Sequence, residues 1–326
     1  MSYKATVLGC GLVGATIARD LTADAEFDVT VVDANEANLK RAEAASGLKA
    51  RRADLSSPQG IKDVIADADI VLGAMPSALG FMVLRAVIEA RKPFSDISFM
   101  AEDAMELDEL AKANEVAAVV DCGVAPGLAN LMIGHCHHAL DRTDRVAYYV
   151  GGLPKHPKPP YFYKAPFAPL DVIEEYTRPA RMRENDKLVT KPALSEPEEI
   201  ELPRVGKLIA FNTDGLRSLL GTIAAPNMVE KTLRHPGHIE LMAVLRETGF
   251  FDKEPIDVRG ASVRPIDVTA KLMFPLWKHD AGEDEFTVMR VIVEGQKAGR
   301  PQKFVYDLYD EYEPISGQSS VARTAG

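Results

Sequence analysis

The chain has 326 residues, of which 46% are hydrophobic, and its formal net charge is −10 at pH 7. This length suits about two domains, and the acidic balance argues against a nucleic-acid partner, which needs a basic surface. No apolar run approaches the ~18 residues of a membrane span, the N-terminus lacks a signal-peptide pattern, and three cysteines cannot all pair. We therefore expect a reduced, cytoplasmic, soluble protein with no membrane partner.

Short apolar runs alternate with helix-length amphipathic segments over residues 1–124. Strands that alternate with helices predict parallel strands joined by right-handed crossovers, which form a doubly wound sheet. Because the runs are almost continuously apolar, both faces of this sheet should be covered. We expect an α/β domain of the Rossmann type at residues 1–124. Its predicted strands are Ala5–Leu8, Val29–Val32, Leu48–Ala53, Ile70–Ala74, Phe94–Ile97 and Ala117–Val120.

A glycine-rich turn with the pattern GxGxxG ends the first predicted strand and opens the first helix. Alone the pattern is weak evidence, but in this position it is typical of a turn that holds the pyrophosphate of a dinucleotide. The next strand ends at Asp33, whose carboxylate suits two ribose hydroxyls and repels a 2′-phosphate, and no arginine follows it directly. We predict NAD as the cofactor; the alternative is a packing turn without a ligand. The residues of the turn are Gly9, Gly11, Leu12, Val13 and Gly14.

The loops after the later strands lie at the edge where sheets of this kind bind ligands. A side chain after the third strand can border an adenine, and one after the fourth lies beside the nicotinamide ribose. Each such residue is as often a helix cap or a turn former as a ligand contact. The predicted cofactor site is completed by Asp54, Leu55, Met75, Pro76, Ser98 and Cys122.

A second glycine-rich turn, Gly123–Gly127, follows the sixth predicted strand. No acidic residue ends a further strand about 20 residues later, so a second dinucleotide site is not expected. We interpret the turn as the hinge by which the chain leaves the first domain, and residues 125–326 as the second. The same edge rule places Asp121, just before the turn, near the nicotinamide.

The second half of the chain is richer in strands with an alternating pattern. We expect an α+β catalytic domain built on a mixed, largely antiparallel sheet with helices on one face. The proline-rich segment Pro154–Pro160 suits neither element and is expected to form a surface loop or lid. Expected strands include Val146–Val150, Leu208–Phe211 and Thr287–Val293, the last paired with Phe304–Leu308; expected helices are Asp171–Tyr176, Gly237–Thr248 and Ile266–Phe274.

Two groups of histidines in this half invite a chemical interpretation. His135 and His138 have a spacing that places them on one helical face, but no CxxC or HExxH pattern accompanies them, so we predict no metal. His235 lies before a proline and a glycine that bend the chain into a helix. It is a candidate proton carrier, and a structural histidine at a helix start is the alternative.

The segment 212–217 combines an expected helix start with an arginine. Thr213 or Asp214 is predicted to cap the helix, and Arg217 falls on its first turn. The planar guanidinium suits the carboxylate of an amino acid. A surface salt bridge on an ordinary helix is the alternative.

Several blocks of the sequence resemble the lysine 6-dehydrogenases, which belong to the saccharopine dehydrogenase-like oxidoreductases. The resemblance extends from about residue 4 to residue 321. It implies NAD-dependent oxidation at the ε-amino carbon of L-lysine, with Thr213, Asp214 and Arg217 in substrate binding and with Asp121 and His235 as proton carriers. Members of the family continue into a further helix beyond the point that corresponds to Ser319–Gly326, so the resemblance implies a shortened member or a truncated chain. The blocks are GCGLVG, VVD, DCGVAPGLAN, EEYTRPAR, ALSEPEEIELPRVGKLIAFNTDGLRSL and KTLRHPGH.

Two other functions remain open at this level. A saccharopine or carboxynorspermidine reductase would need more than one arginine near its substrate, because that substrate carries extra carboxylates. The sequence alone does not show whether Arg178 and Arg181 lie near Arg217. A dinucleotide-sensing protein without catalysis would keep the glycine turn alone. The expected partners are a small amino-acid substrate and a second copy of the chain in a homodimer.

Overall fold

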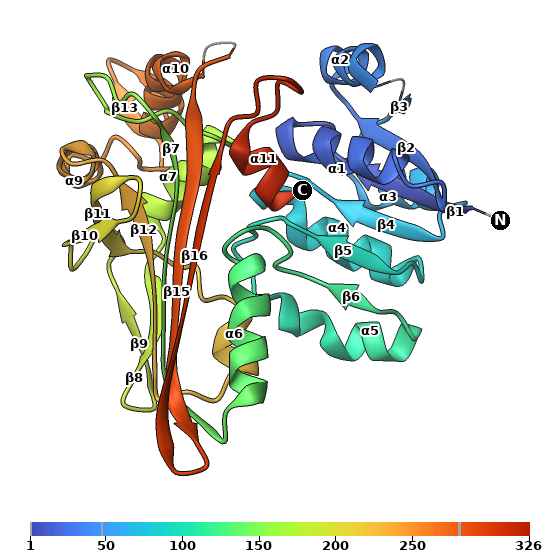
Figure 1. Ribbon diagram of the computed structural model, residues 1–326. Helices are drawn as coiled ribbons and strands as arrows, with labels where there is room; N and C mark the ends of the chain where they lie inside the picture. Colours follow the sequence, from blue (N-terminus) through green and yellow to red (C-terminus); the bar gives the residue numbers. More distant parts are fainter. Residues whose placement is uncertain (1, 47, 280–281) are drawn as a thin grey trace. The chain divides into compact units, whose positions relative to one another are not determined.

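The computed structural model describes residues 2–46, 48–279 and 282–326. The chain divides into two units (Figure 1). The first contains the residues up to Leu128 together with Ala322–Gly326, and the second is Ala129–Val321. The last five residues of the chain group with the first unit. Most of these residues belong to the short helix α11 (Ser320–Ala325), which has no distinctive sequence pattern.

Six parallel strands form the sheet of the first unit, in the order β3-β2-β1-β4-β5-β6. This order confirms the predicted doubly wound sheet. The strands are β1 (Tyr3–Leu8), β2 (Phe27–Asp33), β3 (Lys49–Arg52), β4 (Ile70–Gly73), β5 (Phe94–Asp96) and β6 (Ala118–Val119). The helices are α1 (Leu12–Thr22), α2 (Glu36–Ser46), α3 (Pro58–Ile65), α4 (Ser77–Glu89), the 3₁₀ helix η1 (Ala104–Leu107) and α5 (Asp108–Asn114).

The apolar strands of the first unit are buried on both faces of the sheet. Val7 belongs to a hydrophobic cluster with residues of α1 and α2, whereas its neighbour Leu8 belongs to a cluster with residues of α3 and α4. Val31 and Val32 on β2 divide in the same way. Because successive side chains of a strand point to opposite faces, a strand covered on both sides must be continuously apolar.

The second unit is built on an eight-stranded mixed sheet. Its main path runs β10-β11-β12-β7-β15-β16, and β8 pairs with β12 and β9. Among the described strands of this sheet, only β12 and β7 pair in parallel, so the sheet is largely antiparallel, as predicted. The strands are β7 (Arg142–Pro154), β8 (Ala180–Glu184), β9 (Lys187–Lys191), β10 (Glu198–Leu202), β11 (Gly206–Asn212), β12 (Asn227–Arg234), β15 (Glu285–Lys297) and β16 (Arg300–Glu311).

The core of the second unit lies between this sheet and three of its helices. Trp277 and Tyr176 are fully buried there beside Phe211 of β11. The helices of the unit are α6 (Leu128–Ala139), α7 (Pro169–Thr177), α8 (Leu219–Thr222), α9 (His238–Glu247) and α10 (Pro265–Trp277), of which α7, α9 and α10 supply core residues. A separate hairpin of β13 (Ile256–Val258) and β14 (Ala261–Val263) precedes α10. Within the described ranges, no helix has the length and apolar character needed to cross a bilayer.

Candidate functional site

The glycine turn between β1 and α1 is shaped by close backbone contacts. Gly9 has a φ of 98°, and a Cβ there would lie 2.4 Å from the carbonyl oxygen of Ala74. A Cβ on Gly14 would lie 2.1 Å from the carbonyl oxygen of Gly9, so neither position tolerates a side chain. Gly11, the N-cap of α1, faces open space, and no side chain caps the helix. The turn therefore leaves helix N–H groups available on an open side, which suits a pyrophosphate.

Asp33 ends β2 and accepts hydrogen bonds with both carboxylate oxygens. The backbone N–H of Cys10 donates to Oδ2 at 2.7 Å, and that of Asn35 donates to Oδ1 at 2.7 Å. Its partner in the parallel register is Arg52 of β3, whose side chain is 68% exposed and lies 3.4 Å from Glu36. Sequence reasoning missed this guanidinium because it considered only the residues that directly follow Asp33.

The other predicted cofactor residues near the edge differ in accessibility. Leu55 is 3% exposed and packs in the core of the first unit, and its place in the cofactor site stays a prediction. Asp54 is exposed, and hydrogen bonds from Ser56 lower its pKa. Leu12 is 52% exposed, whereas Val13 packs against the core.

The loops after β4 and β6 hold three further predicted residues. Pro76 is exposed and is the N-cap residue of α4, and Met75 before it is half-buried. Cys122, after β6, is half-buried and donates its backbone N–H to the carbonyl oxygen of Asp96. These loops and the glycine turn all follow the carboxyl ends of strands of one parallel sheet.

Two carboxyl groups lie close together after β5 and β6. Asp96 is 1% exposed, and Ser98 Oγ donates to its Oδ1 at 2.8 Å. Burial raises the pKa of Asp96 to about 7 against the opposing hydrogen bonds of Ser98, and the charge of Asp121 raises it further. Oδ2 of Asp96 has no hydrogen-bond partner among the described residues. The predicted base Asp121 thus has a second, buried carboxyl beside it, which sequence reasoning did not select.

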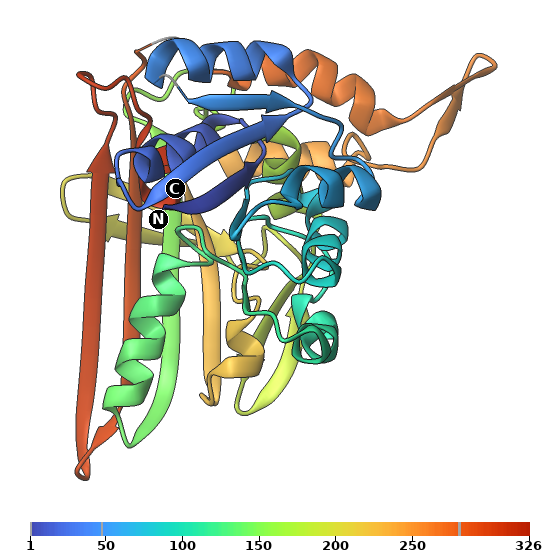
Figure 2. The same ribbon diagram turned by 90° about the vertical axis from the view of Figure 1, so that its right-hand side faces the viewer.

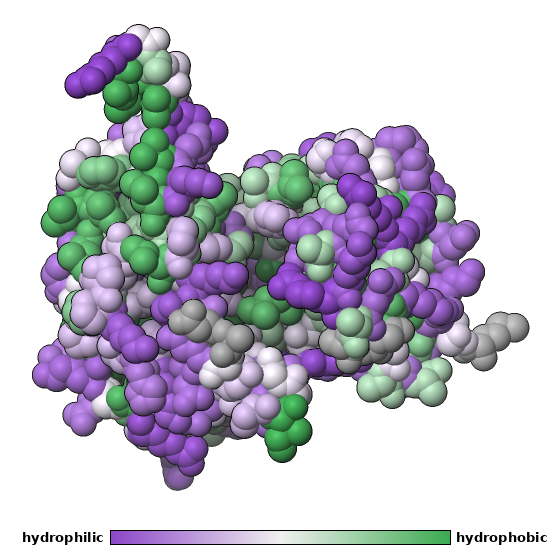
Figure 3. All heavy atoms as spheres, turned by 90° about the horizontal axis from the view of Figure 1, so that it is seen from above, coloured by the Kyte–Doolittle hydropathy of each residue, from purple (hydrophilic) through white to green (hydrophobic). Residues whose placement is uncertain are grey.

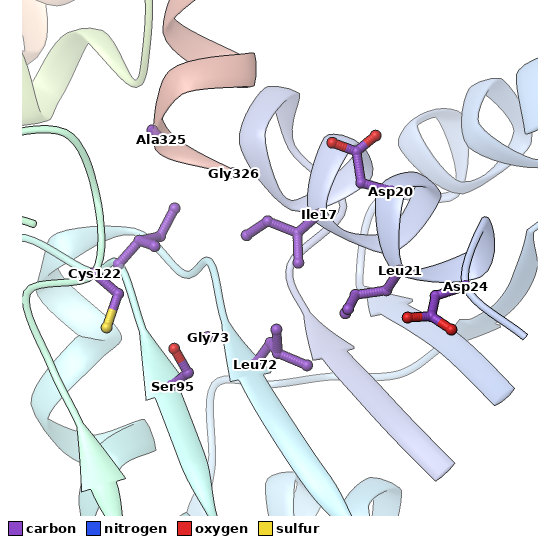
Figure 4. Close-up of a pocket in the computed structure, with 11 residues that line it drawn as sticks. Ile17, Asp20, Leu21, Asp24, Leu72, Gly73, Ser95, Cys122, Ala325 and Gly326 are labelled. Carbon is purple, nitrogen blue, oxygen red and sulfur yellow. The ribbon is translucent and has the colours of Figure 1, made fainter. Parts of the chain in front are cut away.

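A cavity of about 330 Å³ lies elsewhere in the first unit (Figure 4). Its walls come from α1, from β4 and β5 and from the last two residues of the chain. Of the predicted cofactor residues, only Cys122 lines it, so this cavity is not the cradle formed by the glycine turn. Its lining residues are Ile17, Asp20, Leu21, Asp24, Leu72, Gly73, Ser95, Ile97, Cys122, Ala325 and Gly326.

In the second unit, a buried carboxylate binds two arginines. Asp214 is 2% exposed and follows β11. Arg181 of β8 donates to both of its oxygens at 2.9 Å, and Arg217 Nη1 donates to Oδ2 at 3.0 Å. The predicted helix cap is wrong, because α8 begins only at Leu219 and its N-cap is Ser218. Asp214 instead uses its charge to hold two guanidinium groups.

A third arginine lies within electrostatic range of this pair. Burial lowers the pKa of Arg178, and the charges of Arg217 and Arg181 lower it further. Glu174 compensates in part, with a carboxylate oxygen 3.7 Å from Arg178 Nη2. Arg181 and Arg217 thus bind Asp214, whereas Arg178 pairs with Glu174, which also binds Lys253. The surplus of positive charge suits an anionic ligand.

Two buried side chains of the underlying sheet form hydrogen bonds to the turn 213–215 and support it. Glu230 of β12 accepts hydrogen bonds at Oε2 from Thr213 Oγ1 at 2.6 Å and from the backbone N–H of Gly215 at 3.0 Å. Tyr148, its register partner on β7, donates to the carbonyl oxygen of Gly215 at 2.5 Å. The predicted ligand residue Thr213 is thus 4% exposed and part of this support. Because β12 also carries Lys231, Thr232 and Arg234, no pattern in the sequence singled out Glu230.

The histidines of the KTLRHPGH block have different surroundings. His235 is half-buried, and its Nε2 lies 2.9 Å from the carbonyl oxygen of Pro154. Because a carbonyl only accepts, Nε2 carries the proton and Nδ1 is the basic nitrogen. Burial lowers the pKa of His235, so the ring is neutral at pH 7. His238 is fully buried between Tyr161 and Tyr176 and has a structural position.

His135 and His138, whose spacing places them on one helical face, belong to α6. His137 Nδ1 lies 2.8 Å from Thr143 Oγ1. Over residues 2–46, 48–279 and 282–326, no three His, Cys, Asp or Glu side chains group in a way that could hold a metal ion.

Known proteins resemble both units. The profile described as Saccharopine dehydrogenase NADP binding domain matches residues 5–119, and that described as Saccharopine dehydrogenase C-terminal domain matches residues 123–326. The chain is 26% identical over 239 residues to an alpha-aminoadipic semialdehyde synthase of Arabidopsis thaliana, covering 68% of this chain and 22% of that protein. It is 24% identical over 272 residues to a saccharopine dehydrogenase [NADP(+), L-glutamate-forming] of Saccharomyces cerevisiae, covering 79% of this chain and 60% of that one.

The chain thus spans less than two thirds of the length of either relative. A solved structure of saccharopine dehydrogenase (L-Glu forming) from Saccharomyces cerevisiae superposes with a TM-score of 0.78 at 18% identity, covering 99% of this chain and 88% of that chain. At that identity the likeness concerns the fold. The two matched profiles together cover almost all of the chain, which therefore belongs to the saccharopine dehydrogenase family.

Proposed function

We propose that the protein is an NAD-dependent amine dehydrogenase that oxidises the ε-amino carbon of L-lysine, giving 2-aminoadipate 6-semialdehyde and ammonia. The observation that carries this proposal is the arginine cluster around Asp214, with Arg181 and Arg217 bound to it and Arg178 close by. Its surplus positive charge suits an amino-acid α-carboxylate. The dinucleotide-binding domain would hold the nicotinamide cofactor to which the hydride is transferred.

The residues of the chain divide the work between binding and proton transfer. Arg217 binds the α-carboxylate. Because Asp214 already fixes the Arg217 guanidinium, binding costs little further side-chain conformational entropy. Asp121 accepts a proton from the ε-ammonium, because only the neutral amine can lose hydride from its carbon. Asp96, whose pKa burial raises to about 7, is the neighbouring carboxyl group. His235, neutral at pH 7, is the second proton carrier. A bound nicotinamide would supply the hydride acceptor, and water would hydrolyse the resulting iminium ion of the substrate to the aldehyde and ammonia.

The cofactor proposed is NAD, on the strength of the carboxylate at the end of β2. Asp33 presents both oxygens at the mouth of the glycine turn, where a 2′-phosphate would meet their charge. NADP is the alternative, and one observation favours it. Arg52 lies opposite Asp33 in the sheet and its guanidinium is mostly exposed, so it is available to a 2′-phosphate.

A saccharopine-type reaction is the second candidate. Saccharopine carries more than one carboxylate at a distance from its secondary amine, and three clustered guanidinium groups suit such a substrate better than a single arginine would. The similarity to the saccharopine dehydrogenase of Saccharomyces cerevisiae points the same way.

One assay separates these functions. The purified protein is incubated with lysine or saccharopine and with NAD or NADP, and the reduced nicotinamide is followed by absorbance while ammonia and glutamate are measured. The proposal expects reduction of NAD with lysine and one ammonia for each hydride. Reduction with saccharopine alone, accompanied by glutamate, would replace it with the second candidate. Turnover with neither amine, despite dinucleotide binding, would refute both.

A further inference from the structure

The turn that follows β11 is polar and yet buried. Polar and charged side chains usually lie at a protein surface, and hydrophilic residues cover much of the face seen in Figure 3. Thr213 and Asp214, by contrast, are 4% and 2% exposed, and Gly215 is buried with them. Because no water reaches the backbone of such a turn, its N–H and C=O groups need partners within the protein.

Two neighbouring strands of the sheet supply both partners of Gly215. Glu230 on β12 and Tyr148 on β7 lie opposite each other in the parallel register, and Figure 2 shows these strands side by side, β7 in green and β12 in gold. The Gly215 N–H donates to Glu230 Oε2 at 3.0 Å, and the Gly215 carbonyl oxygen accepts from the Tyr148 hydroxyl at 2.5 Å. The backbone of the turn is thus held at both polar atoms of one residue.

The carboxyl group of Glu230 also fixes the side chain of Thr213. Thr213 Oγ1 donates to Glu230 Oε2 at 2.6 Å and lies 2.8 Å from Thr232 Oγ1. Because a hydroxyl carries one proton, Thr232 is then the donor to Thr213. A Cβ on Gly215 would lie 2.5 Å from the carboxyl carbon of Glu230, so a side chain there would displace the carboxyl group. Shape and hydrogen bonds together set the position of the turn.

The residue between Thr213 and Gly215 is the carboxylate that fixes the arginines. Asp214 Oδ1 accepts from the backbone N–H of Arg181 at 3.1 Å and from its Nε at 2.9 Å, and Oδ2 accepts from Arg217 Nη1 at 3.0 Å. Arg217 has a φ of 47°, in the left-handed region that arginine rarely occupies. Such a conformation persists only where the surrounding structure determines it. The place of the Arg217 guanidinium therefore depends on where the turn holds Asp214.

We propose that Glu230 and Tyr148 are positioning residues for the carboxylate of the substrate. They hold the turn, the turn places Asp214, and Asp214 orients the Arg217 guanidinium that receives the carboxylate. Neither positioning residue touches the substrate, since Tyr148 is fully buried and Glu230 is 2% exposed. This role rests on the proposed function of Arg217, and it applies to lysine and to saccharopine alike. A guanidinium held in place beforehand loses less conformational freedom when it binds.

Steady-state kinetics of single and double variants test this order of contacts. Tyr148→Phe removes only the hydroxyl that donates to Gly215, and it should raise KM for the amine by about threefold to tenfold with a smaller change in kcat. In the Arg217→Ala background the same substitution should change KM by less than about twofold, because its effect passes through Arg217. An equal effect in both backgrounds, or no effect in either, overturns the proposal.

Two variants of Glu230 and one matched control complete the kinetic test. Glu230→Met removes both acceptor contacts and should raise KM as Tyr148→Phe does, whereas Glu230→Gln keeps an acceptor oxygen and should preserve KM. The control is Tyr149→Phe, because Tyr149 follows Tyr148 on β7 and faces the other side of the sheet, where its hydroxyl interacts with Glu198 and Arg145. It should leave KM unchanged. The amine is lysine if the proposed function holds and saccharopine if the second candidate does, so a wrong substrate assignment does not hide the result.

A labelling experiment tests the positioning without any turnover. Phenylglyoxal, which modifies guanidinium groups, is applied to the protein alone, and the modified peptides are quantified by mass spectrometry. The Arg217 side chain is 6% exposed and should react slowly in the unmodified protein and in Glu230→Gln, but roughly threefold faster or more in Tyr148→Phe and Glu230→Met. Arg290, which donates twice to Asp307, is the internal reference and should keep its rate. Unchanged labelling of Arg217 in both variants refutes the positioning role, and so does an equal acceleration at both arginines, which would mean a general loosening of the fold.

Discussion

Replacing Glu230 with glutamine should remove a strong pH dependence from the stability of the second unit. Glu230 is 2% exposed, and its Oε2 accepts hydrogen bonds from Thr213 and Gly215. Burial raises the pKa of its carboxyl from 4.5 to about 8, outweighing the hydrogen bond from Thr213 that lowers it. Glutamine has nearly the same shape and keeps an acceptor oxygen for both donors, so Glu230→Gln changes the titration with little change in packing.

The sign of the effect follows from the raised pKa. Between the unfolded pKa and the folded one, the native state holds a proton that the unfolded state has released. The stability that this proton contributes is fully present below pH 4.5 and is lost as the pH rises through about 8. The slope is ~1.4 kcal/mol per pH unit, so between about pH 6 and 8 the unmodified protein should lose roughly 2–3 kcal/mol that Glu230→Gln does not lose. For a unit of this size that corresponds to roughly 5–10 °C in Tm.

The single tryptophan of the chain makes this measurable in one unit. Trp277 is fully buried in the core of the second unit, so its fluorescence reports the unfolding of that unit. Thermal unfolding is followed by the fluorescence of Trp277. As the pH is raised, the Tm of the unmodified protein should fall faster than the Tm of Glu230→Gln. Glu201→Gln, at an exposed position on β10, is the matched control and should follow the unmodified protein. Parallel curves for the unmodified protein and Glu230→Gln would refute the argument from burial.

Three further predictions concern the proposed reaction. Arg217→Ala should lower kcat/KM for lysine by about tenfold to a hundredfold, because a charge-assisted contact is lost, while the NAD affinity measured by calorimetry stays unchanged. Weaker NAD binding with unchanged kcat/KM for lysine would remove Arg217 from the substrate site. The control is Arg183→Ala, since the Arg183 guanidinium donates to the carbonyl oxygen of Leu220. Asp121→Asn should lower kcat more than it raises KM in steady-state assays, since its proposed role is proton transfer; a change confined to KM would contradict that role. Asp33→Ala should narrow the preference for NAD over NADP in titration calorimetry, and equal affinities in the unmodified protein would refute the argument from its carboxylate.

The first unit could be predicted from the sequence in detail because its signals are local. A continuously apolar strand, a glycine turn and an amphipathic helix each depend on residues within a few positions of one another. The strand ends at Leu8 and Asp33 and the position of the glycine turn followed from those patterns. In the second unit the alternating pattern of Thr287–Val293 predicted both a strand and its pairing with Phe304–Leu308, since a short connection favours an antiparallel partner.

The surroundings of the site residues were decided only by tertiary structure. Arg52 lies opposite Asp33 because of the register between two strands, and Asp96 lies within electrostatic range of Asp121 because β5 and β6 are neighbours in the sheet. The segment around Asp214 reads as a helix start, yet the carboxylate binds Arg181, which lies 33 residues earlier in the chain. No local pattern encodes a contact between residues so far apart. Charge pairing across such distances depends on how whole strands and helices pack, and this packing determines which carboxyl groups keep their protons and which guanidinium groups meet.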